Sequence, residues 1–119
     1  MECGVESDVL ERAEAAWQAA NDELVAAARL RRPVERRSGA PTLQIPDSML
    51  ALGAIGTAAS ELAVMMGELR KLITAAREAT VGRDHIERSV EVEIMTVAWQ
   101  TRRVRTLRVK YEERWRRPR

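Results

Sequence analysis

Apolar residues recur at seven-residue spacing in three long stretches of the chain, and each stretch predicts an α-helix. The first covers about residues 9–31, between the capping-box pair Asp8 and Glu11 and the helix-breaking Pro33. Large apolar residues alternate with alanines along one side: Leu10, Ala13, Trp17, Ala20, Leu24 and Ala27. This narrow seam is typical of a helix that packs closely against a partner.

The second stretch, about residues 47–80, has the widest apolar face in the chain. It follows Pro46 and ends before Gly82, which are residue types common at the two ends of a helix. Three neighbouring columns form the face: Ile55, Leu62, Leu69 and Ala76; Leu52, Ala59, Met66 and Ile73; and Ala58, Met65, Leu72 and Ala79. An apolar face about 100° wide predicts the central helix of a bundle.

The third stretch, about residues 84–117, contains no Gly, Pro, Asn or Asp after Asp84. Its apolar column consists of Val90, Val97, Val104 and Tyr111. Apolar and charged residues also alternate within 90–94 and 107–111, which is the period of a β-strand. No turn residue separates the two alternating segments, so we favour one helix, joined to the second in an antiparallel hairpin.

The sequence therefore predicts an all-α fold, a bundle of three long helices in a single domain at residues 1–119. Residues 32–46 contain three prolines and the basic pair Arg36 and Arg37, which predicts a long, exposed, extended loop. A loop of about fourteen residues can span roughly 46 Å, whereas the first helix is roughly 35 Å long. The first two helices can therefore run parallel or antiparallel.

Several large apolar residues fall outside the main column of the third stretch. Val92, Met95 and Trp99 share a different side of the predicted helix. Trp115, which supports the main column near the end of the helix, is the fourth candidate interface residue. A contiguous exposed apolar patch indicates association, whereas a patch covered by the same chain does not. We weigh equally a contact with the first helix of the same molecule and an interface with a partner.

Charge is distributed unevenly between the two ends of the chain. The first twenty-eight residues carry seven acids and one base, and residues 100–119 carry nine bases and two acids. The C-terminal segment is thus a basic amphipathic helix end. Four interpretations stay open: a solvated helix end, a mate for the acidic first helix of a neighbouring subunit, a sequence-independent phosphate binder, and a membrane-surface or other partner-bound helix. The candidate polyanion-binding residues are Arg102, Arg105, Arg108, Arg116 and Arg117.

The residues that could act in catalysis have no accompanying nucleophile, base or metal ligand in this sequence. The only histidine, His85, lies at the start of a predicted helix, and the only cysteine, Cys3, lies near the N-terminus. Glu61 and Glu68 are about 10 Å apart along one helix, and we interpret them as carboxylates on a solvated face with basic neighbours. We therefore expect no enzymatic activity, no cofactor and no metal site.

Membrane insertion is not expected from the sequence. Met1 to Leu10 lacks the basic and apolar regions of a signal peptide. The longest uncharged run, Ser48 to Ser60, is shorter than the roughly twenty residues of a membrane span. These features predict a cytoplasmic protein or a component of a particle assembled inside the cell.

The sequence favours a non-enzymatic helical assembly subunit or adaptor. The reasons are the strong heptad spacing, the opposite charges of its two ends and the lack of a catalytic group of residues. We expect it to self-associate or to pack in a larger complex through coiled-coil-like contacts, for example as a virion connector or packaging component. The alternative is an accessory protein that binds nucleic acid without sequence specificity through its basic C-terminal helix.

Overall fold

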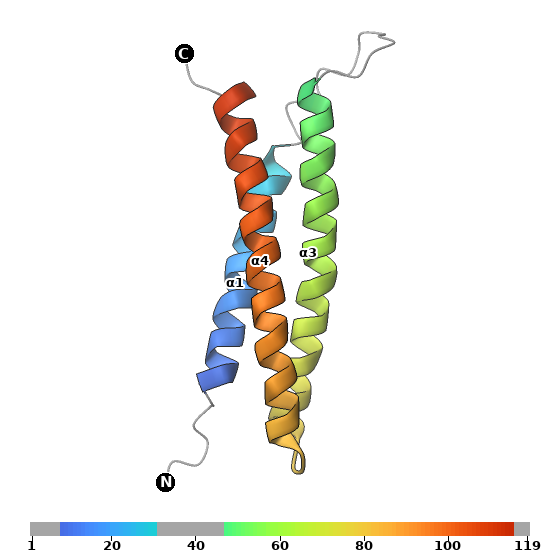
Figure 1. Ribbon diagram of the computed structural model, residues 1–119, viewed down its shortest axis with the longest axis vertical. Coiled ribbons are helices and arrows are strands. Elements are labelled where there is room, and N and C mark those ends of the chain that lie inside the picture. Colours follow the sequence, from blue (N-terminus) through green and yellow to red (C-terminus); the bar gives the residue numbers. More distant parts are fainter. Residues whose placement is uncertain (1–7, 31–46, 116–119) are drawn as a thin grey trace.

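The computed structural model describes residues 8–30 and 47–115 as three long helices packed together. They are α1 (Asp8–Arg29), α3 (Asp47–Glu78) and α4 (Arg83–Trp115) (Figure 1). These bounds agree with the predicted helices to within about two residues, so the all-α bundle is confirmed. The predicted loop at 32–46 and the helix end at 116–117 lie outside the described residues.

The direction of α1, which the sequence left open, is antiparallel to α3 and parallel to α4 (Figure 1). Contacts between charged residues show this order directly. Glu14 in the first half of α1 meets Arg70 and Arg77 near the end of α3. Arg12 meets Glu91 in the first half of α4, and Glu23 meets Arg105 in its second half.

Helix α4 is continuous through both segments that showed strand-like alternation, so the strand alternative is wrong. The alternating residues are distributed around the helix. Val90 is fully buried and Val92 is 64% exposed, although both are valines two positions apart. The absence of a turn residue decided the local structure, as expected from the sequence.

The hydrophobic core lies mainly between α3 and α4. Leu62, Leu69 and Ile73 of α3 are fully buried. They pack in one cluster with the inner stripe of α4, which comprises Val90, Val97, Val104 and Tyr111. Helix α1 closes the cluster with small residues as well as Leu10, because Ala13 and Ala20 allow its backbone to come close.

A tight turn joins α3 to α4. Gly82 has a φ of 76°, a left-handed conformation that a residue with a side chain adopts at a cost. The backbone N–H groups of His85 and Ile86 donate to the Gly82 carbonyl oxygen at 3.1 and 3.2 Å, which starts α4 immediately. The predicted hairpin is therefore confirmed.

Helix α3 is long and apolar enough, by length and composition alone, to cross a membrane. An eighteen-residue stretch of it has a mean hydropathy of 1.6. A core helix of a soluble bundle meets the same criterion, so this is weak evidence for a span. Only 28% of that stretch is buried in the bundle, and α3 thus keeps apolar surface that the other helices do not cover. The sequence expectation of no span stays a prediction.

Candidate functional site

The outer stripe of α4, made of Val92, Met95 and Trp99, is an exposed apolar strip on the surface of the described bundle. These side chains are 64%, 73% and 56% exposed. Their spacing of three and four residues places them on one side of the helix, away from the fully buried Val90 and Val97. The stripe does not pack against α1, so the intramolecular contact that the sequence allowed is not made.

Basic residues surround the outer stripe along α4. Arg88, Arg102 and Arg103 are exposed and precede or follow it by about one turn. The Arg103 guanidinium lies 5.8 Å from the centre of the Trp99 ring, within reach of a cation–π contact. The outer stripe therefore has a positive charge at each end, and Glu91 and Glu93 stand on either side of Val92 in the chain.

Trp115 was predicted to belong to the same interface, and it lies elsewhere. Its ring packs against the buried Tyr111 at a centroid distance of 5.3 Å, on the inner side of α4. The Arg114 guanidinium lies 4.9 Å from the Trp115 ring centre. Trp115 is 37% exposed and covers the end of the core, apart from the outer stripe.

Glu23 of α1 holds two bases of the C-terminal helix. Its side chain is only 4% exposed, and its Oε1 accepts a hydrogen bond from Arg105 Nε at 3.3 Å. Arg108 donates to both carboxylate oxygens of Glu23 and, at 3.2 Å, to Glu112 Oε1. The hydrogen bond to Glu23 raises the pKa of Arg108 above its ordinary value. Two candidate polyanion-binding residues thus neutralise an acid of their own chain.

The predicted polyanion set is accordingly divided. Arg102 is exposed, Arg105 is 51% exposed beside Glu23, and Arg108 is only 19% exposed. Arg116 and Arg117 lie outside the described residues. Arg102 and Arg105 also line a shallow hollow of about 200 Å³ between α1 and α4.

Sequence reasoning missed the burial of Glu23, although a signal was present. Val9 and Ala16 of α1, and Leu30 just after its end, stand at seven-residue intervals with Glu23. Leu30 is buried, and Val9 and Ala16 are partly buried. An acid in such a column requires a base opposite, because a buried charge without a partner is costly.

A second charged cluster joins α1 to α3. Both Glu14 carboxylate oxygens accept hydrogen bonds from Arg70, at 3.0 and 3.1 Å, and one also accepts from Arg77 at 2.8 Å. The hydrogen bond from Arg70 is the main reason why the pKa of Glu14 lies below its ordinary value. Arg70 also lies 4.8 Å from the Trp17 ring centre. This cluster fixes the antiparallel alignment of the two helices.

Glu61 and Glu68, the two carboxylates of α3 discussed above, each contact a neighbouring side chain. Gln100 is 1% exposed, and its Nε2 donates to the Ala58 carbonyl oxygen at 3.0 Å and to Glu61 Oε1 at 3.1 Å. Glu68 lies 3.6 Å from the Lys71 ammonium. Glu61 therefore satisfies a buried amide, a role that the sequence interpretation did not include.

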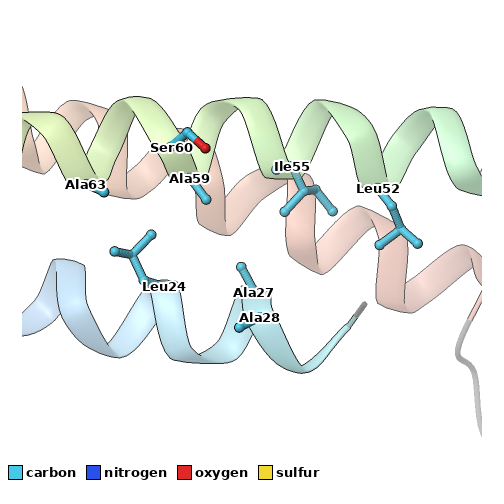
Figure 2. A pocket seen from close by; sticks show the side chains of 9 residues that line it. Leu24, Ala27, Ala28, Leu52, Ile55, Ala59, Ser60 and Ala63 are labelled. Atoms are coloured by element: carbon cyan, nitrogen blue, oxygen red, sulfur yellow. The ribbon is translucent and has the colours of Figure 1, made fainter. Parts of the chain in front are cut away.

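A groove of about 200 Å³ separates the end of α1 from the start of α3. Figure 2 shows Leu24 and Ala27 of α1 across from Ile55 and Ala59 of α3. Ser60 supplies the only polar side chain among the residues that line it. The groove offers apolar contact and lacks the convergent polar groups of a catalytic pocket.

Metal-ligand clusters of three or more His, Cys, Asp or Glu are not found within residues 8–30 and 47–115. His85 is exposed at the start of α4, as expected from the sequence, and Cys3 lies outside the described residues. No family model, curated protein or solved structure matches the chain. The geometry of its own surface is thus the basis for a functional argument.

Proposed function

We propose that this chain is a non-enzymatic assembly subunit that binds copies of itself or other subunits in a larger complex inside the cell. The observation that supports this proposal is the outer stripe of α4. Val92, Met95 and Trp99 are large, contiguous and more than half exposed. A contiguous apolar patch on a soluble bundle is typical of an interaction surface.

Among the described residues, the hydrophobic core cluster does not include the three side chains of this stripe. The inner side of α4 already supplies the core with Val90, Val97 and Val104, each fully buried. Trp and Met are enriched in protein interfaces, and Arg accompanies them there. Trp99 with Arg103 over its ring has this composition. A virion connector or packaging component is one kind of assembly that such a subunit fits.

The proposal is tested by the native mass of the protein in sedimentation measurements over a wide range of concentration. We expect the parent chain to form species larger than one copy, and Met95→Glu to reduce them, because a charge in the contact must be desolvated. Val64→Glu is the matched control, since Val64 is 67% exposed on α3 and lies outside the stripe. A parent chain that stays monomeric at every concentration, alone and with lysate proteins, contradicts the proposal.

Nucleic-acid binding is the second candidate function, and the exposed bases of α4 support it. Arg102, Arg103 and Lys110 are exposed along one helix, and Arg102 lines the hollow between α1 and α4. If these residues contact phosphates, Arg102→Glu should weaken binding to any DNA sequence equally. The slope of the logarithm of affinity against the logarithm of salt concentration should then fall by about one unit. Equal affinity of parent and variant contradicts this candidate.

A further inference from the structure

The outer face of α1 complements the outer stripe of α4 in size. Ala15 and Ala19 lie on this face, and both are exposed. Two small residues four positions apart form a shallow strip on a helix surface, whereas Met95 and Trp99, also four apart, form a ridge. Large side chains of one helix can therefore pack over small residues of another at short interaxial distance.

The two surfaces are also complementary in charge. Asp8, Glu11 and Asp22 are exposed along the outer face of α1, and Asp8 retains 82% of its side-chain exposure despite its contact with Arg12. Arg88 and Arg102 are exposed at the two ends of the outer stripe of α4. The acidic strip with small apolar residues on α1 thus matches the large apolar residues of α4 and the two arginines at their ends, which favours association of these faces.

The alignment of α1 and α4 within one chain places the matching residues at the same height. The two helices are parallel, and the contacts Arg12–Glu91 and Glu23–Arg105 join residues 79 and 82 positions apart. Ala15 is therefore level with Met95, and Ala19 with Trp99. The same shift brings Asp22 level with Arg102 and Asp8 level with Arg88.

We propose that the outer stripe of α4 binds the outer face of α1 of a second copy of this chain, with the two helices parallel and level. This inference rests on the proposed self-association and names its contact. Met95 and Trp99 cover Ala15 and Ala19 of the second copy, while Arg88 and Arg102 face its Asp8 and Asp22. Glu91, which comes level with Glu11 of that copy, is already paired with Arg12 of its own chain at 2.8 Å.

A symmetric contact between two α4 helices is disfavoured by charge. An antiparallel pair centred on Met95 would place Arg88 of one copy opposite Arg102 of the other, and like charges repel. A pair of α1 outer faces would bring Glu11 and Asp22 together in the same way. The contact is therefore head-to-tail: each copy binds one neighbour through its α4 stripe and the other neighbour through its α1 face.

A head-to-tail contact between level copies has no axial step from one copy to the next. Repeated application of a rotation without a step gives a closed ring, whereas a step gives a helical filament. The ring axis would run parallel to the three helices. The expected particle is thus a ring of bundles that stand side by side.

The sharpest test uses two variants that each block one face. Met95→Glu with Trp99→Glu blocks the stripe, and Ala15→Glu with Ala19→Glu blocks the α1 face, so that the two altered faces carry like charges and repel each other. All four positions are exposed, so both variants should keep the helix content and melting temperature of the parent. Each variant alone should lose the higher-mass species.

Mixing the two variants should restore a particle of two chains, because one intact stripe then meets one intact α1 face. A symmetric α4 contact would not be restored by mixing, since it needs two intact stripes. If the parent assembles and the mixture stays monomeric, or if either variant assembles alone, the head-to-tail contact is wrong while self-association stands. If the parent does not assemble, the proposed self-association fails as well.

Cross-linking then tests the parallel register. In a Cys3→Ser background, Ala15→Cys with Met95→Cys should give disulfide-linked multimers under mild oxidation, because a disulfide needs Cα atoms within about 7 Å. Ala15→Cys with Trp99→Cys is the matched control, displaced by about one turn, or roughly 6 Å. More efficient cross-linking of the control pair would overturn the level, parallel arrangement.

Discussion

Helix α4 carries two apolar stripes with opposite surroundings. In the inner stripe, Val90, Val97 and Val104 are 0% exposed, whereas in the outer stripe Val92, Met95 and Trp99 are 56% to 73% exposed. Both stripes have helical spacing, and each contains valine. Residue spacing therefore identifies the sides of a helix, whereas burial depends on which of those sides the neighbouring helices cover.

The largest loss of stability should come from a substitution in α3 where it packs against the inner stripe of α4. Leu69→Ala removes a fully buried side chain and leaves a cavity, so the free energy of unfolding should fall by about 2–5 kcal/mol. Val64→Ala, on the exposed side of the same helix, should leave it nearly unchanged. Denaturant unfolding monitored by circular dichroism measures both. An unchanged midpoint for Leu69→Ala would refute the central position of α3.

A matched pair on α4 compares the two stripes by the same chemical change. Val97→Ala deletes two buried methyl groups and should cost about 2 kcal/mol of unfolding free energy. Val92→Ala, at a residue that is 64% exposed, should cost less than about 0.5 kcal/mol. Unfolding is best measured at low protein concentration, where association does not add stability. Equal costs at the two positions would mean that the outer stripe is buried in the free chain.

The smallest changes in stability should depend on pH. The charged forms of Glu14 and Glu93 should contribute to folding stability with opposite signs. Arg70 lowers the pKa of Glu14, so this carboxylate stabilises the fold above its ordinary pKa of 4.5 and loses that contribution as pH falls through its lower, folded value. Burial, with a smaller effect of the Glu68 charge, raises the pKa of Glu93. Its charged form therefore opposes folding at neutral pH and ceases to do so when protonated.

We expect Glu14→Gln to lower stability at pH 7 and to approach the parent in acid. Glu93→Gln should raise stability at pH 7, and this gain should also vanish in acid. Both differences should be about 1 kcal/mol or less, because these side chains are partly exposed to solvent. Melting temperatures across the acid range measure them. The same sign for both variants would contradict the surroundings described for the two acids.

Much of the fold could be predicted because its determinants are local in sequence. The α3–α4 hairpin followed from Gly82 and from the breaker-free stretch after Asp84, and both features appear in the structure. The antiparallel course of α1 could not be predicted, since the connection is long enough for either direction. The structure decides it through contacts such as Glu14 with Arg70, which join residues 56 positions apart.

The surface of α4 could likewise be predicted only in part. The sequence placed Val92, Met95 and Trp99 on one side of a helix, but it left open whether α1 would cover them. It also grouped Arg108 with exposed bases, whereas Glu23 and Glu112 hold that side chain within the bundle. The packing of the three helices decides which charges are neutralised. This packing cannot be inferred from neighbouring residues in the sequence.

The amino-acid sequence alone specifies the three helices, their apolar faces and the turn between α3 and α4. These depend on period, on breakers and on the left-handed Gly82, which act over a few residues. The packing of the helices buries Glu23, brings Gln100 to Ala58 and Glu61, and leaves the outer stripe of α4 exposed to solvent. The sequence did not predict these three features. They were not predictable because the burial of a side chain depends on neighbours that are distant in the sequence.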